Sequence, residues 1–258
     1  MLCNDIINRM EDTYPRKSAE EWDNVGLLVG RADKEIQRIY VALDATDEVI
    51  EEAIRQKADL LLTHHPLLFT PVSQITGDDF IGRRILKLAK HDISYYAMHT
   101  NYDVIRMAAL AGEILGLRET EVMHITDEET GEGIGRVGKF ERKVTVKECC
   151  ELVKEKFQLA AVKVYGDLDA VADLIAISPG SGKHMSDFAI SKGAKAFVTA
   201  EIDHHEALDA NARGMAIIDA GHYGLEHIFI KDMLDFFNKN TQGIEIIGAK
   251  VKHPYCVI

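Results

Sequence analysis

Adjacent histidines at the end of an apolar run are the first residues of this chain that suggest chemistry. The apolar run is Leu60, Leu61 and Leu62. A threonine, then His64 and His65, and then a proline follow it. A lone histidine at a strand end is usually structural, but two in a row are harder to explain that way. Because consecutive strand residues point to opposite faces, both imidazoles reach one site only from a turn, which the proline favours.

Two further motifs place a carboxylate four positions after a histidine: His99 with Asp103, and His222 with Glu226. Mixed imidazole and carboxylate donors suit zinc, manganese, iron or cobalt, and the lack of thiolates argues against a structural zinc finger. A carboxylate has two oxygens and can bridge two ions about 3.5–4 Å apart, an arrangement that activates water. The motifs together predict a metal site.

The elements that must position these side chains follow an α/β pattern, because short apolar or β-branched runs alternate with amphipathic segments. After a first helix at residues 3–10 and a loop leading into a strand at 21–30, strands are expected at 38–43, 60–63, 93–98, from 134, at 162–164, 174–177, 196–199 and 216–219. Helices are expected at 47–56, 82–90, 103–115, 147–157, 185–192, 206–213 and 225–237. Ligands in open α/β sheets gather beyond the carboxyl ends of strands, where the histidine motifs fall.

The order of these motifs repeats along the chain. Residues 58–63 (ADLLLT) are echoed by residues 194–199 (AKAFVT), and a histidine pair follows each run, at 64–65 and at 204–205. A helix, a strand and a histidine–carboxylate pair come next in both places. We interpret the repetition as a duplication, although any α/β protein can produce such echoes by chance.

The predicted fold is therefore α/β, with two related repeats, mixed sheets and the metal centre between them. The first repeat covers residues 1–127 and carries His64, His65 and Asp103. The second covers residues 128–258 and carries His222 and Glu226, with its C-terminal part packing back on the first.

The overall composition excludes several kinds of partner. The 258 residues include 47% hydrophobic and 28% charged residues, which is ordinary for a globular protein, and the net charge is −12. A strongly acidic chain disfavours nucleic acid and anionic membranes as partners.

The four cysteines form no C-x-x-C pair, which is typical of reduced structural thiols. Neither a signal peptide nor a membrane span is apparent, so we expect a cytoplasmic protein.

Two loops allow more than one interpretation. Residues 179–183 (PGSGK) fail the Walker spacing, but free amides at the following helix and Lys183 could hold an anionic group. A tight strand-to-helix turn is the structural alternative. The segment Trp22, Asp23 and Asn24 is either an Asx turn beside a buried tryptophan or a loop that lines the site.

Several motifs together make the chain resemble a dinuclear-metal family, the GTP cyclohydrolase 1 type 2 homologues, also called the NIF-three-like family. They are WDNVGLLVG at 22–30, LTHHP at 62–66, HTNYD at 99–103, DHHEALDA at 203–210 and IDAGHY at 218–223. The resemblance covers essentially the whole chain and implies two intertwined α/β repeats with a two-metal centre in a toroidal homohexamer. The ligands it implies are His64, His65, Asp103, His222 and Glu226, with Glu226 as the bridge. It implies that His99 is a weak ligand or supports one.

Some positions depart from the family pattern. The usual Thr-Gly-Asp is Thr-Ala-Glu at residues 199–201, the usual Ser-Glu is Leu-Glu at 225–226, and the glycine-rich helix start after Asp103 is replaced by residues 104–107 (VIRM). These changes leave the ligands in place and alter the surroundings where a substrate would bind.

The function we expect is a metal-dependent hydrolase, GTP cyclohydrolase type 2-like, that acts on a nucleotide or similar small molecule. Two divalent ions per subunit (Zn, Mn, Fe or Co) would serve as cofactors, and Glu201, His205 or His99 would transfer protons. A phosphoesterase on the same centre is one alternative. A metal-binding hexameric scaffold or regulator without catalysis is another, because a shared fold does not fix a reaction.

Overall fold

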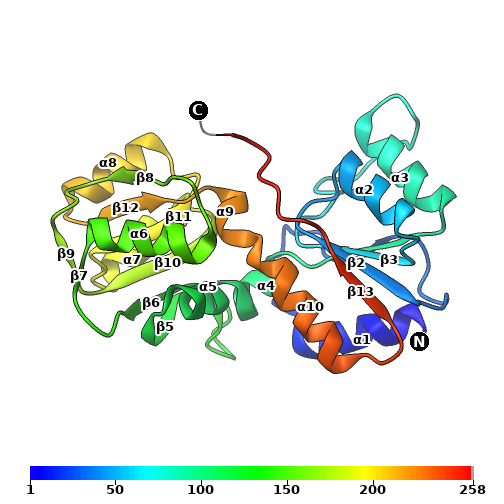
Figure 1. Ribbon diagram of the computed structural model, residues 1–258, viewed down its shortest axis with the longest axis horizontal. Coiled ribbons are helices and arrows are strands. Elements are labelled where there is room, and N and C mark those ends of the chain that lie inside the picture. Colours follow the sequence, from blue (N-terminus) through cyan, green and yellow to red (C-terminus); the bar gives the residue numbers. More distant parts are fainter. Residues whose placement is uncertain (257–258) are drawn as a thin grey trace. The chain divides into compact units, whose positions relative to one another are not determined.

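Two compact units make up the chain, and the computed structural model describes residues 1–256 (Figure 1). The first unit contains Met1–Tyr102 and Phe229–Val251, and the second contains Asp103–Ile228 with the C-terminal residues from Lys252 onward. This division differs from the expected repeats at 1–127 and 128–258, because the chain leaves the first unit after Tyr102 and returns to it at Phe229. Both units are mixed α/β structures.

A five-stranded mixed sheet forms the first unit, in the order β1-β4-β3-β2-β13. The neighbours β13, β2, β3 and β4 run parallel, and β1 pairs antiparallel with β4 at the edge. The strands are β1 (Gly26–Val29), β2 (Arg38–Ala42), β3 (Leu60–Thr63), β4 (Ser94–Ala97) and β13 (Glu245–Gly248). The helices are α1 (Cys3–Thr13), η1 (Arg16–Ser18), α2 (Asp47–Arg55), α3 (Phe80–Lys90), α4 (Thr100–Tyr102) and α10 (Ile228–Asn240). Ile50 of α2 and Leu88 of α3 pack with Leu61 and Tyr95 of the sheet into one buried core.

A six-stranded mixed sheet forms the second unit, in the order β5-β6-β10-β11-β12-β8, with β10, β11 and β12 parallel. Its strands are β5 (Arg118–Ile125), β6 (Gly133–Lys139), β8 (Lys163–Tyr165), β10 (Ile175–Ser181), β11 (Ala196–Ala200) and β12 (Ala216–Asp219), beside a small β7 (Val144–Thr145) and β9 (Val171–Ala172) pair. Its helices are the π-helix η2 (Asp103–Met107), α5 (Ala108–Leu115), α6 (Val146–Phe157), α7 (Ser186–Ser191), α8 (His204–Ala212) and α9 (His222–Glu226). Ala189 of α7 and Ala207 of α8 pack with Phe197 and Ile217 of the sheet.

Four strands have the same order and directions in both units, as a duplication requires. In the first unit β2, β3 and β4 are successive parallel neighbours, and the preceding strand β1 pairs antiparallel with β4. In the second unit β10, β11 and β12 are successive parallel neighbours, and the earlier strand β8 pairs antiparallel with β12. His99 follows β4 and His222 follows β12, so the two histidines occupy equivalent places in the two topologies.

Three expected elements differ from the structure for local reasons. The expected turn at residues 179–182 is wrong, because β10 continues to Ser181 through a register shift and pairs with Ala200. The helix expected at 103–115 begins as a π-helix. The helix expected at 225–237 is interrupted at His227, where α9 ends and α10 begins.

Four strands were missed, namely β5, β7, β9 and β13. For β13 the reason is a non-local pairing, and for β5 it is a polar sequence. β13 pairs with β2, whose residues lie about two hundred positions earlier in the chain. β5 is rich in charged residues and mostly exposed, so it lacks the apolar alternation that identifies a half-buried strand.

The helices of the described residues include none with both the length and the hydrophobicity that crossing a membrane requires. Three of the four cysteines are buried, namely Cys3, Cys149 and Cys150, whereas Cys256 is exposed. Burial, together with the neighbouring Cys150, raises the pKa of Cys149 to about 12, and burial also raises the pKa of Cys3 and of Cys150.

Thiol titration tests this burial pattern. At about pH 8, a thiol reagent should modify one cysteine per native chain rapidly, because a thiolate reacts and a buried thiol with a raised pKa stays protonated. All four cysteines should react after unfolding in guanidinium. The Cys256→Ser variant should lose the rapid phase. Rapid modification of Cys149 or Cys150 in the folded protein would show that α6 is not packed as described.

Candidate metal centre

Three histidines of the first unit converge at the carboxyl ends of β3 and β4. The ring centroids of His64 and His65 are 4.9 Å apart, and those of His64 and His99 are 5.2 Å apart. The rings of His65 and His99 are 5.5 Å apart, and one nitrogen from each of the three lies within 4.8 Å of the others. Three imidazoles with converging nitrogens are a donor set suited to a transition-metal ion.

Hydrogen bonds to Nδ1 fix the orientation of the first two rings. His64 Nδ1 donates to the backbone oxygen of Met98 at 2.9 Å, since a carbonyl can only accept. His65 Nδ1 lies 2.8 Å from Oδ1 of Asp44. A protonated Nδ1 places the lone pair on Nε2, and an oxygen acceptor in this position is how metal-binding histidines are usually oriented.

Asp23 has the same role for the third ring. Its side chain is fully buried and accepts from His99 Nδ1 at 2.9 Å and from the amide of Thr100 at 2.9 Å. Burial alone would raise the pKa of Asp23, but hydrogen bonds from His99 and Thr100 outweigh it and lower the pKa to about 2. The carboxylate is therefore ionised at neutral pH and keeps the proton on His99 Nδ1.

The turn that carries His64 and His65 is built around the hydroxyl of Tyr95, whose ring is fully buried. This hydroxyl is 2.7 Å from Thr63 Oγ1, accepts from the amide of Leu67 at 2.8 Å and donates to the backbone oxygen of His65 at 3.0 Å. Both histidines thus lie beyond the end of β3 on a turn, as the sequence predicts.

In the second unit, His222 and Glu226 lie one turn apart on α9. His222 Nε2 is 2.9 Å from Glu226 Oε2, and His222 Nδ1 is 3.0 Å from Oε2 of Glu201. Metal–ligand bonds of about 2.0–2.2 Å put adjacent ligands of an octahedral ion about 3 Å apart, so the Nε2–Oε2 spacing fits two donors to one ion. Glu201 orients this imidazole as Asp44 and Asp23 orient theirs.

Asp219, at the end of β12, ties together the two loops that present Glu201 and His222. Its Oδ1 accepts from the amides of Glu201 at 3.3 Å and Gly221 at 3.1 Å. Its Oδ2 pairs with Lys163 Nζ at 2.8 Å, and this hydrogen bond raises the pKa of Lys163. Glu201 and Gly221 have φ values of +52° and +76°, so both loops use left-handed backbone to turn sharply after their strands.

Two further predicted residues, Asp103 and His205, belong to the second unit. Asp103 is the first residue of η2 in the second unit. His205 lies in the first turn of α8, exposed, with its ring 5.2 Å from that of His204. Trp22 is 64% exposed, so the interpretation of the 22–24 segment as a turn beside a buried tryptophan is wrong.

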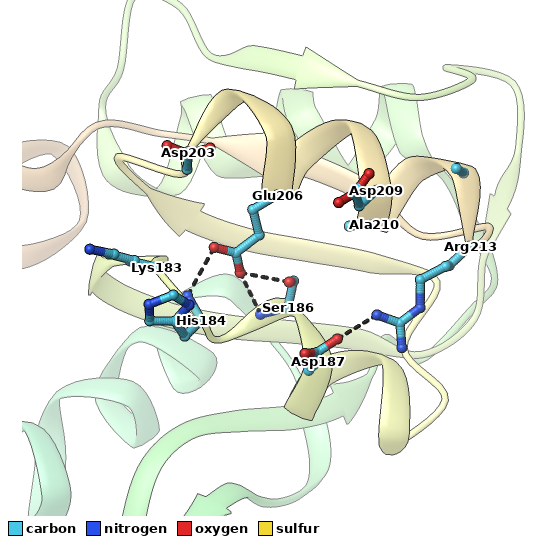
Figure 2. Close-up of a pocket in the computed structure, with 10 residues that line it drawn as sticks. Lys183, His184, Ser186, Asp187, Asp203, Glu206, Asp209, Ala210 and Arg213 are labelled. Atoms are coloured by element: carbon cyan, nitrogen blue, oxygen red, sulfur yellow. Dashed lines mark hydrogen bonds and ion pairs between the residues drawn. The ribbon is translucent and has the colours of Figure 1, made fainter.

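A cavity of ≈ 710 Å³ in the second unit lies between α7 and α8 and is lined by none of the candidate metal ligands (Figure 2). Figure 2 shows the Glu206 carboxylate directed at the loop before α7, where it accepts from the amides of His184 at 2.9 Å and Ser186 at 3.2 Å. It also accepts from Ser186 Oγ at 2.6 Å. The amides of His184 and Ser186, at the start of the following helix, are thus used by Glu206, which argues against an anion site formed with residues 179–183.

Sequence reasoning missed Asp44. The signal was present, because Asp44 follows the strand β2, which is a parallel neighbour of β3, and the ends of such strands meet at one edge of the sheet. Asp44 also lies three residues before the start of α2, so a role near the helix cap explains its residue type equally well from the sequence.

A family model described as Duf34/NIF3 (NGG1p interacting factor 3) matches residues 1–254. The chain belongs to the Duf34/NIF3 family. It is 40% identical to a "GTP cyclohydrolase 1 type 2 homolog" of Clostridium perfringens over 99% of both chains. This confirms the family that the motifs indicated.

Solved structures of Duf34/NIF3-like proteins show the same fold. A hypothetical protein of Staphylococcus aureus superposes with a TM-score of 0.91 at 28% identity, covering 100% of this chain and 99% of that one. Reduced HcgD of Methanocaldococcus jannaschii superposes with a TM-score of 0.83 at 30% identity, covering 96% and 97%.

Replacing the acceptor of His65 tests the role of the Nδ1 hydrogen bonds in this family member. Asp44→Asn should lower the affinity for Zn²⁺ by roughly 10- to 100-fold, because the ring loses a charged acceptor that fixes its orientation. Asp33→Asn is the control, since Asp33 lies in the same unit, is 81% exposed at its side chain and contacts Arg31. Competition with a chromogenic chelator measures both. Equal affinities in the two variants would remove Asp44 from the centre.

A glycine pair tests the placement of Glu226, which is buried in α9. A Cβ at Gly180 (φ +80°) would lie 2.8 Å from Glu226 Oε1, whereas a Cβ at Gly214 (φ +86°) meets nothing within 4 Å. Both alanine variants should be less stable by about 1–2 kcal/mol, because alanine disfavours the left-handed backbone conformation of these positions. Metal content after loading should fall only in Gly180→Ala. A similar metal content in both variants would mean that Glu226 does not serve as a ligand.

Proposed function

We propose that this chain is a dinuclear metal-dependent hydrolase, GTP cyclohydrolase type 2-like, that acts on a nucleotide or similar small substrate. The observation that carries the proposal is the set of four imidazoles whose Nδ1 atoms all face an oxygen. The names of the relatives, GTP cyclohydrolase 1 type 2 homologues, support the choice of reaction.

Five residues would hold two divalent ions (Zn, Mn, Fe or Co): His64, His65, Asp103, His222 and Glu226. The proposed bridge is Glu226, because a carboxylate can give one oxygen to each ion. The converging imidazoles of the first unit and the 2.9 Å spacing of His222 and Glu226 support the donor chemistry. Bound ions would activate water and polarise the substrate bond that is cleaved.

Side chains near the ligands can handle the protons of the reaction. Glu201 is the strongest candidate, because its carboxylate is 61% exposed and already hydrogen-bonded to His222. His99 forms a carboxylate–imidazole pair with Asp23 and can accept a proton at Nε2. His205 remains a third candidate, from an exposed position on α8.

The assembled form we propose is a homohexamer, on the family resemblance. Light scattering of the metal-loaded protein should then give six times the 28.8 kDa mass of the chain. A hexamer that binds metal without any turnover would instead support the scaffold alternative.

The ligand assignment predicts two ions per chain and unequal losses in two variants. Glu226→Ala should reduce occupancy at both positions because it removes the bridge, while Asp103→Ala should empty mainly one. Elemental analysis after loading with Zn, Mn, Fe or Co measures the stoichiometry. One ion per wild-type chain, or equal losses in the two variants, would contradict the dinuclear assignment with Glu226 as bridge.

Turnover of GTP by the loaded protein tests the reaction itself. Opening of the guanine ring changes the purine absorbance and releases formate, whereas a phosphoesterase releases phosphate and leaves the ring intact. We expect ring opening that disappears with a chelator and in His65→Ala, and persists in the control Asp33→Asn. Phosphate release alone would favour the phosphoesterase, and no product from a broad nucleotide panel would rule against a hydrolase.

A further inference from the structure

Two exposed aromatic side chains flank the histidine cluster of the first unit. Trp22 is 64% exposed and Phe69 is 53% exposed. The ring of His99 meets both of them edge-on, with centroid distances of 5.9 Å to Trp22 and 5.7 Å to Phe69 and interplanar angles of 78° and 87°. Aromatic side chains around a few converging polar groups are the usual lining of a ligand-binding site.

The loops that carry these rings are fixed by partly buried hydrogen bonds. The residue after Trp22 is Asp23, whose fully buried carboxylate accepts from His99 Nδ1 and from both the amide and the hydroxyl of Thr100. Asn24 Nδ2 donates to the backbone oxygen of Leu68 at 2.6 Å, which ties the first loop to the segment that carries Phe69. Both rings are therefore presented in place before a ligand arrives, which reduces the entropy lost on binding.

We propose that Trp22 and Phe69 form a stacking site for a planar heteroaromatic ring, such as a purine base, beside His99. The proposal rests on the proposed function, since it names the part of the substrate that the chain recognises outside the metal ligands. Stacking supplies affinity that does not depend on charge, because every base has a π face. This matters for a chain of net charge −12, which repels an anionic nucleotide except at its local cations.

The tryptophan provides its own measurement, because Trp22 is the only one in the sequence. In the metal-loaded protein, guanosine and GTP should quench its emission in a saturable way, and inorganic tripolyphosphate should not. Quenching by tripolyphosphate equal to that by GTP would overturn the stacking site in favour of a phosphate site. A Trp22 emission that changes with protein concentration but not with guanosine would also overturn the stacking site. That result is expected if a second copy of the chain covers Trp22.

Variants of Phe69 provide the second measurement, with a matched control. Phe69→Leu should weaken guanosine binding about fivefold to a hundredfold, the range expected for one base–aromatic stack, while Phe69→Tyr should retain it. Phe80→Leu is the control, because Phe80 lies in the same unit and is 52% exposed. Thermal melting of each variant establishes that the chain is folded. Equal affinity in Phe69→Leu and Phe80→Leu would overturn the proposal.

The two proposals fail in different ways. Metal-dependent turnover of GTP with unchanged Trp22 emission would overturn the stacking site and leave the hydrolase in place. Saturable quenching that is lost in Phe69→Leu, without turnover of any nucleotide, would support the stacking site and overturn the hydrolase. If both hold, Phe69→Leu should raise KM and leave kcat nearly unchanged, because the base contact is uniform in the ground and transition states.

Discussion

An oxygen atom opposite Nδ1 fixes each imidazole of the candidate centre. The acceptor is a backbone carbonyl at Met98 and a carboxylate at Asp44, Asp23 and Glu201. Without these hydrogen bonds the rings could rotate or change tautomer, and within each unit the direction of the Nε2 lone pairs would be lost. The remaining features serve this one constraint: the strand ends bring the rings together, the turn around Tyr95 holds two of them, and buried neighbours hold the acceptors.

Parallel strands bring ligands and acceptors together in each unit. Because adjacent strands lie about 4.8 Å apart, residues that follow neighbouring strands can touch without long loops. Asp44, His64 and Met98 come after β2, β3 and β4 of the first unit, and Glu201 and His222 come after β11 and β12 of the second. The repeated order of three parallel strands and one antiparallel strand explains how a duplicated unit can supply histidines at equivalent places. The two units also differ in their details; Asp23, for example, lies on the loop before β1 of the first unit.

Much of the fold and of the candidate site could be predicted because it depends on local sequence. The apolar runs of β3 and β11 and the histidines that follow them are continuous in the chain. What could not be predicted depends on contacts between distant residues. The pairing of β13 with β2, the use of Glu206 to cap the loop before α7, and the burial of Asp23 under Thr100 all join segments that no periodicity connects. The exposure of Trp22 belongs to this group, since a tryptophan is buried or exposed according to its neighbours in space.

Anomalous diffraction from crystals of the zinc-loaded protein tests the central claim most directly. The account predicts two zinc positions per chain about 3.5–4 Å apart, with Nε2 as the ligand atom of His64, His65 and His222 and with Nδ1 still facing its oxygen. A single zinc position would contradict the dinuclear centre. Coordination through Nδ1 of His65, with Asp44 turned away, would contradict the constraint on which the site depends.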